Sequence, residues 1–165
     1  RVFHNLTVMQ NIVVALMQPN EESPCWALSH LRSWRGVVKH YRDEAEVYLA
    51  KVGLQERRFA LAGELSFGEQ KLLSMARLMA KDFELLLLDE PTAGLSPPMV
   101  EQMTSILTDL AERQGTTIGL IEHNMTFVAN LAYWVYFLHE GEVAFVGRGD
   151  HVLGNEDVRE MYMGV

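Results

Sequence analysis

The chain has 165 residues, enough for one domain with its own hydrophobic core and hardly enough for two. The formal net charge of −8 argues against a general nucleic-acid binder, and Cys25, the single cysteine, excludes an internal disulfide. The sequence has no apolar run near the roughly 18 residues that a membrane span needs, and no signal peptide is visible at its start.

The first 60 residues have the pattern of a helical region. Thr7 is a suitable cap for the first helix, and Gly53 is a suitable stop for the last one. Two prolines and several polar residues predict a connector at residues 18–25. The expected helices cover residues 8–17, 26–34 and 37–52.

From residue 65 the pattern changes to helices alternating with strands. A two-residue turn at Glu140-Gly141 predicts a hairpin, and the tail from residue 151 to 164 is expected to be helical. Together these elements predict an α/β layer that follows a helical insert. The expected helices cover residues 66–80, 97–113 and 125–131, and the expected strands residues 85–88, 116–121, 135–138 and 143–146.

Four leucines at residues 85–88 form the most informative of these strands. They show no alternation, so we expect a strand of a parallel sheet that is buried on both faces. Asp89 and Glu90 follow at its carboxyl end, the edge of an open sheet where ligands bind, and Pro91 prevents a helix from continuing. Asp89 is a candidate ligand for Mg²⁺ and Glu90 a candidate base for an attacking water, although two acids also suit an ordinary loop.

A second informative stretch surrounds the start of the helix expected at residue 66. Ser66 and Glu69 have the spacing of a capping box, which by itself needs no function. A helix N-terminus also binds phosphate through its free N–H groups, and Gly68 has no Cβ to keep an anion away. Because that glycine weakens the helix by roughly 1 kcal/mol relative to alanine, we interpret it as a hint of function.

A third informative stretch, Ile121-Glu122-His123-Asn124, lies at the carboxyl end of the second apolar strand. If the two strands are neighbours, His123 reaches the same sheet edge as Asp89 and Glu90. Its imidazole is then a candidate donor to a phosphate oxygen. A lone histidine in this place is more simply an ordinary loop residue, but three such sites at one sheet edge favour a functional site.

The three stretches and their order resemble the motifs of an ATP-binding-cassette ATPase. The resemblance implies a P-loop NTPase (RecA-like) α/β core, of which residues 65–165 are the C-terminal part. It also implies that residues 1–64 are an all-helical subdomain that meets a membrane permease. The matching motifs are the signature at Leu65, Ser66, Phe67, Gly68, Glu69 and Gln70, the Walker B strand at residues 85–91 with its catalytic Glu90, the D-loop at Ala93, Gly94, Leu95 and Ser96, and the switch histidine at His123.

The resemblance implies a mechanism with ATP and Mg²⁺. Two ATPase subunits would close head to tail around two ATP molecules, at the cytoplasmic face of the cell membrane and without nucleic acid. The signature of one subunit would contact the γ-phosphate held by the other, and the D-loop would connect the two sites. Asp89 would organise Mg²⁺, Glu90 would activate water, and His123 would steady the γ-phosphate.

Several features depart from the family pattern. Phe67, Glu69 and Ser96 replace the residues that many members carry, and no lysine lies in a phosphate loop of the form Gly-x-x-x-x-Gly-Lys-Ser/Thr. The expectation is a C-terminal portion of a cassette that is inactive by itself. Within the family, the resemblance is greatest to branched-chain amino acid importers, in Ala93-Gly94-Leu95, in Ile121-Glu122-His123 and in the tail Val158 to Gly164. Lipopolysaccharide-export ATPases have a similar tail. The alternatives are a scaffold that hydrolyses nothing and an ATPase for export or DNA repair.

Overall fold

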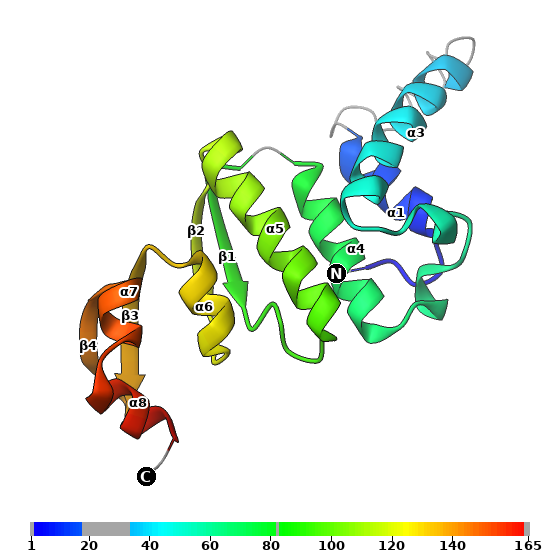
Figure 1. Ribbon diagram of the computed structural model, residues 1–165. Helices are drawn as coiled ribbons and strands as arrows, with labels where there is room; N and C mark the ends of the chain where they lie inside the picture. Colours follow the sequence, from blue (N-terminus) through cyan, green and yellow to red (C-terminus); the bar gives the residue numbers. More distant parts are fainter. Residues whose placement is uncertain (1, 18–33, 82, 164–165) are drawn as a thin grey trace. The chain divides into compact units, whose positions relative to one another are not determined.

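The computed structural model describes residues 2–17, 34–81 and 83–163 of the chain (Figure 1). They form two compact units, which we call unit 1 (Arg1–Glu84 and Gly94–Gln102) and unit 2 (Leu85–Ala93 and Met103–Val165). The connector and most of the short helix expected between residues 18 and 34 lie outside the described residues. The functional division expected between residues 64 and 65 stays a prediction. In the described part of the chain, no helix combines the length and apolar character that crossing a bilayer requires.

The described part of unit 1 is helical, as expected. Helix α1 (Val8–Leu16) packs against both α3 (Trp34–Lys51) and α4 (Phe67–Met79), and α3 also packs against α4 (Figure 1). Two 3₁₀ turns, η2 (Gln55–Arg57) and η3 (Ala62–Glu64), connect α3 to α4. The three helices contribute the buried apolar residues Val8, Ile12, Leu49, Leu72, Leu73 and Ala76, and η3 contributes Ala62.

The starts and ends of these helices follow local chemistry. The Thr7 side chain accepts a hydrogen bond from Gln10 N, and the Gln10 side chain accepts one from Thr7 N, which confirms the predicted cap of α1. Gly53 ends α3 with a φ of 65°, a left-handed conformation that glycine adopts without strain. Helix α3 includes residues 34–36, which precede its predicted start at residue 37.

Helix α4 has the capping box that its sequence predicts. The Ser66 hydroxyl accepts from Glu69 N at 3.3 Å, and the Glu69 carboxylate accepts from Ser66 N at 2.8 Å. Both bonds satisfy backbone N–H groups that a helix start otherwise leaves without a partner.

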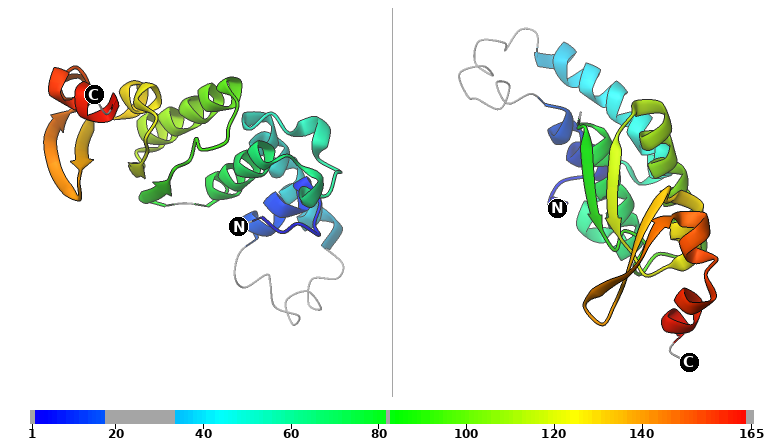
Figure 2. Two further views of the ribbon diagram at one scale, coloured as in Figure 1. Left: turned by 90° about the horizontal axis from the view of Figure 1, so that it is seen from below. Right: turned by 90° about the vertical axis from the view of Figure 1, so that its left-hand side faces the viewer.

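Unit 2 begins with two strands, β1 (Leu85–Asp89) and β2 (Thr117–Ile121), which pair in parallel (Figure 2). Leu85 lies opposite Thr117, and Asp89 lies opposite Ile121, so both strands end at the same edge. Helix α5 (Pro97–Gln114) connects them and buries four apolar residues at helical spacing in unit 2. These residues are Met103, Ile106, Leu107 and Leu110.

One face of this two-stranded sheet is open, which corrects the expectation that the leucine strand is buried on both faces. Leu86 is buried, but Leu85 is 55% exposed and Leu87 is 73% exposed. Ile121 of β2, on the same side, is 69% exposed. Successive residues of a strand point to opposite faces, and the described residues of unit 2 cover only one of them.

The rest of unit 2 is a hairpin with short helices. Strands β3 (Trp134–His139) and β4 (Glu142–Arg148) pair antiparallel as expected, and Glu140 and Gly141 between them both have positive φ angles. Helix α6 (Met125–Leu131) precedes the hairpin, and α7 (Gly149–Leu153) packs against both of its strands (Figure 2). The tail is not one helix, because the Asn155 side chain caps a separate helix, α8 (Glu156–Met163).

The exposed leucine face predicts self-association of the 165-residue chain. Burying a leucine side chain stabilises an association by about 1.5–3 kcal/mol, so Leu87→Lys should weaken the association by about tenfold or more. Light scattering over a concentration series measures the change. Val47→Lys is the matched control, because Val47 is an exposed apolar residue of α3. A chain that stays monomeric at all concentrations would contradict the prediction.

The capping box predicts the cost of removing its hydroxyl. Ser66→Ala should lower the free energy of unfolding by about 1 kcal/mol, because Glu69 N loses its acceptor. Ser74→Ala is the control in the same helix, because the Ser74 hydroxyl donates to the Gln70 carbonyl, a contact that adds little to the stability of a helix. Urea denaturation measures the free energy of unfolding of both variants. An equal loss of this free energy in Ser66→Ala and Ser74→Ala would contradict the predicted contribution of the cap.

Candidate functional site

The parallel pairing of β1 and β2 confirms that the predicted acids and the predicted histidine lie at one edge of the sheet. Asp89 is the last residue of β1 and lies opposite Ile121, the last residue of β2. Glu90 follows β1, and Glu122 and His123 follow β2. Glu90, Glu122 and His123 therefore lie at the carboxyl edge of the sheet, the usual position of ligand sites in open α/β sheets.

Glu90 sits in an unusual backbone conformation. Its φ is 44°, in the left-handed region that residues with a side chain seldom adopt. Glu90 N donates to the Ile121 carbonyl at 2.9 Å, and Ala93 N donates back to the Glu90 carbonyl at 3.2 Å. Such strain persists only where surrounding contacts enforce it, and it is found most often at functional sites.

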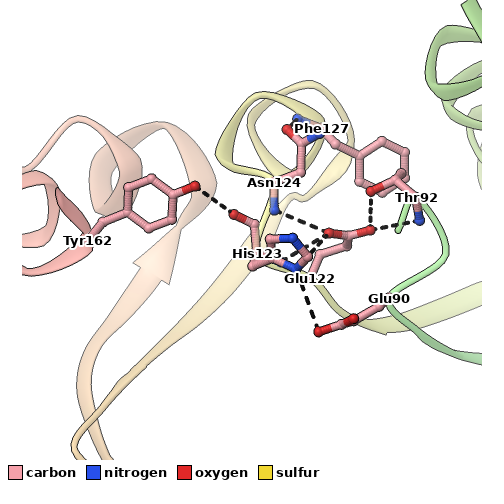
Figure 3. Close-up of polar contacts among 7 residues, drawn as sticks. All are labelled: Glu90, Thr92, Glu122, His123, Asn124, Phe127 and Tyr162. Atoms are coloured by element: carbon pink, nitrogen blue, oxygen red, sulfur yellow. Dashed lines mark hydrogen bonds and ion pairs between the residues drawn. The ribbon is translucent and has the colours of Figure 1, made fainter. Parts of the chain in front are cut away.

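The side chains of Glu90 and His123 approach each other across the two loops (Figure 3). His123 Nδ1 lies 3.5 Å from Glu90 Oε1, and the two groups form an ion pair when the imidazole is protonated. The two side chains are 53% and 68% exposed, respectively. A pair this exposed contributes little to stability, so it does not by itself hold the loops together.

Glu122 provides the stronger connection between the loops. Its side chain is fully buried, and its two oxygens accept hydrogen bonds from both sides (Figure 3). Oε1 accepts from Thr92 N at 2.8 Å and from the Thr92 hydroxyl, while Oε2 accepts from His123 N at 3.0 Å and from Asn124 N at 3.1 Å. Burial acts to raise the pKa of Glu122, but these hydrogen bonds outweigh it and lower the pKa below the ordinary glutamate value.

Two further contacts fix the loop after β2. The Asn124 side chain caps α6 by accepting from Phe127 N at 3.0 Å, and the Phe127 side chain is buried. The Tyr162 hydroxyl of α8 donates to the His123 carbonyl at 2.9 Å (Figure 3). His123 is thus held through its backbone while its side chain stays exposed.

Sequence reasoning did not select Glu122, Thr92 or Tyr162 as site residues. A signal for Glu122 exists in strand alternation: Ile121 points to the open face, so the next side chain points away from it into the protein. Neither Thr92 nor Tyr162 had such a signal, because their contacts join residues 30 and 39 positions apart in the chain.

Asp89 presents a single carboxylate at the end of β1. It is exposed, and no group of three potential metal-ligating side chains occurs among the described residues. Mg²⁺ commonly binds one or two protein carboxylates and takes its other ligands from water and substrate phosphates. One exposed carboxylate at the sheet edge fits that kind of site.

The signature-like residues lie in unit 1, at the start of α4. Leu65 and Gly68 are buried, Ser66 is exposed, and Phe67 is 63% exposed with Lys71 above its ring. The Gln70 side chain donates to the Leu65 carbonyl at 3.0 Å. The Ser66 backbone hydrogen bond lowers the pKa of Glu69. An ionised carboxylate at a helix N-terminus weakens the attraction for a phosphate there.

The beginning of α5 packs against this stretch in unit 1. A Cβ on Gly68 would lie 2.6 Å from the Met99 sulfur, and one on Gly94 would lie 3.1 Å from the Phe67 ring. Close packing therefore accounts for glycine at position 68. The φ of Gly94 is 73°, and the Ser96 carbonyl accepts from Val100 N in the first turn of α5.

The predicted site residues thus fall into two groups. Unit 1 brings the signature-like residues 65–70 together with Gly94 and Leu95. Unit 2 brings Asp89, Glu90 and Ala93 together with His123. Ser96 belongs to unit 1 as well.

Comparison with known proteins gives consistent matches to one family. The family model described as ABC transporter matches residues 1–93. The high-affinity branched-chain amino acid transport ATP-binding protein LivG of Escherichia coli strain K12 is 32% identical over 164 residues, which are 99% of this chain and 64% of LivG. The histidine/lysine/arginine/ornithine transport ATP-binding protein HisP of Salmonella typhimurium is 35% identical over 156 residues, 93% of this chain and 54% of HisP.

Solved structures agree with these matches. The crystal structure of the ADP conformation of MJ1267, an ATP-binding cassette of an ABC transporter, superposes with a TM-score of 0.68 and 27% identity. The match covers 98% of this chain and 64% of MJ1267, so the chain spans less than two thirds of the length of these relatives. With the family model matching more than half of its residues, the chain belongs to the ABC transporter family and has the α/β fold of that family's ATP-binding cassettes.

Proposed function

We propose that the chain is part of the ATP-binding and ATP-hydrolysing subunit of an ABC importer. The observation that carries the proposal is the strained Glu90 turn beside His123 at the carboxyl edge of a parallel strand pair. A carboxylate and an imidazole 3.5 Å apart, next to a candidate Mg²⁺ ligand, suit the activation of a water for attack on a phosphate.

Each residue of the site has a proposed role in this reaction. Glu90 accepts a proton from the attacking water, and His123 donates to the γ-phosphate. Asp89 would hold the hydrated Mg²⁺, which would neutralise phosphate charge when ATP is bound. Ser66 and Gly68, with the other residues of the stretch 65–70, contact the γ-phosphate of a second subunit, and the loop 93–96 lies between the two sites.

The proposed partners follow from the family. A second ATPase subunit pairs head to tail with this one, and the region of residues 1–64 meets a membrane permease at the cytoplasmic face. Both LivG and HisP are named as amino acid transport proteins, which supports an amino acid as the transported solute. The match to LivG over 99% of the chain supports branched-chain amino acids in particular.

A scaffold that hydrolyses nothing is the second candidate. The ionised Glu69 at the start of α4 and the absence of a phosphate-loop sequence in the 165 residues favour it. The Glu90 turn and its contact with His123 favour hydrolysis, because a scaffold has no use for a strained acid at a sheet edge. Co-purification with a permease and a binding protein separates an importer from an ATPase of export or DNA repair.

The proposed role of Glu90 predicts the effect of neutralising it. In the product of the whole reading frame, Glu90→Gln should lower ATP turnover by at least about 100-fold, because the amide cannot accept the proton from water. ATP binding should survive. Phosphate release and the binding of a fluorescent ATP analogue measure the two effects. Glu112→Gln, at an exposed position on α5, is the control. Unchanged turnover in Glu90→Gln would refute the role.

The 165-residue chain by itself should not bind MgATP tightly. Its acids, histidine and signature-like residues have no glycine-rich loop and lysine to cradle the β- and γ-phosphates. Calorimetric titration with MgATP should therefore show no measurable heat of binding. Tight binding would mean that another segment of the chain cradles the phosphates.

A further inference from the structure

The loop that carries Glu90 and the loop that carries His123 share one buried carboxylate. We infer that Glu122 is a positioning residue that sets the distance between Glu90 and His123 by clamping the loop after β1 to the loop after β2. The inference rests on the proposed function for its effect on turnover. The expected effect of Glu122 on the two loops does not depend on the proposed function, because it is inferred from the hydrogen bonds of Glu122 alone.

Each oxygen of the Glu122 carboxylate accepts hydrogen bonds from a different loop. Oε1 takes both bonds from Thr92, two residues after Glu90, and Oε2 takes the bonds from His123 N and Asn124 N. The donors are three backbone N–H groups and one hydroxyl. A carboxylate has only acceptors, so it satisfies all four, whereas an amide would turn donor atoms toward donors.

The clamp acts on two groups whose side chains make only a weak direct contact with each other. Glu90 and His123 meet through exposed side chains, and exposed ion pairs are weak. The φ of 44° at Glu90 favours relaxation of the turn, which the neighbouring Thr92 resists from a buried position. Without the bonds to Glu122, the turn can relax and move the Glu90 carboxylate away from the imidazole.

The first test compares turnover in four variants of the whole gene product. Glu122→Gln should lower kcat by about tenfold or more, because a small misplacement of a catalytic group is costly, while KM for ATP stays within about twofold. Thr92→Val removes the hydroxyl alone and should lower kcat by about fivefold. Thr92→Ser keeps the hydroxyl and should restore wild-type kcat. Glu142→Gln, at an exposed position on β4, is the matched control.

The second test measures the hydrogen bonds of the clamp directly, without ATP turnover. Hydrogen exchange at the amides of Thr92, His123 and Asn124 should accelerate in Glu122→Gln, because the side-chain amide turns its NH₂ group toward the donors of one loop, and its uncharged oxygen accepts more weakly from those of the other. The Ala93 amide, which closes the Glu90 turn, should accelerate with them. The Ala132 amide within α6 should not change, since its acceptor is the Val128 carbonyl.

The outcomes separate this inference from the proposed function. Faster exchange at the four amides together with a selective fall in kcat supports the clamp. Unchanged exchange, or faster exchange with wild-type kcat, overturns it, as does a Thr92→Ser variant as slow as Thr92→Val. A wild type that hydrolyses no ATP overturns the proposed function, while the exchange pattern still supports or overturns the clamp. If Glu122→Gln does not fold, the two Thr92 variants decide the matter.

Discussion

The parallel pairing of β1 with β2 is the constraint on which the candidate site depends. The register places Asp89 opposite Ile121, so the chain leaves both strands at one edge. A shift of the register by one residue would exchange the two faces of a strand and send Glu122 to the open side. The approach of Glu90 to His123 and the burial of Glu122 both follow from this register.

Two acids at this edge have opposite environments. Glu122 is buried and accepts hydrogen bonds from four donors, which compensate the desolvation of its charge. Glu90 is half exposed, and its carboxylate remains accessible beside His123. A buried acid that is fully satisfied orders the loops around it, while an exposed one stays available for chemistry. The contrast shows how one short edge holds both a buried carboxylate that orders the loops and an accessible one.

In unit 1, the residues that resemble the family signature also satisfy ordinary packing and capping. Ser66 and Glu69 cap α4, and Gly68 allows the close approach of Met99. Phe67 lies against Gly94, so the start of α4 and the start of α5 fit together at two glycines. These contacts account for the residue types without a ligand.

The sequence by itself determined the elements, because capping boxes, turns and apolar periodicity act over a few residues. The family was indicated separately, by the resemblance of its ordered motifs. Thr7, Ser66 and Glu140-Gly141 predicted their helices and hairpin correctly, and Asp89, Glu90 and His123 were assigned to one edge. Only the tertiary structure decided the role of Glu122, the break at Asn155 and the exposure of Leu87. Burial and long-range hydrogen bonds depend on which distant segments meet. Local patterns do not contain that information, which is why the contact between Thr92 and Glu122, 30 positions apart, was not foreseen.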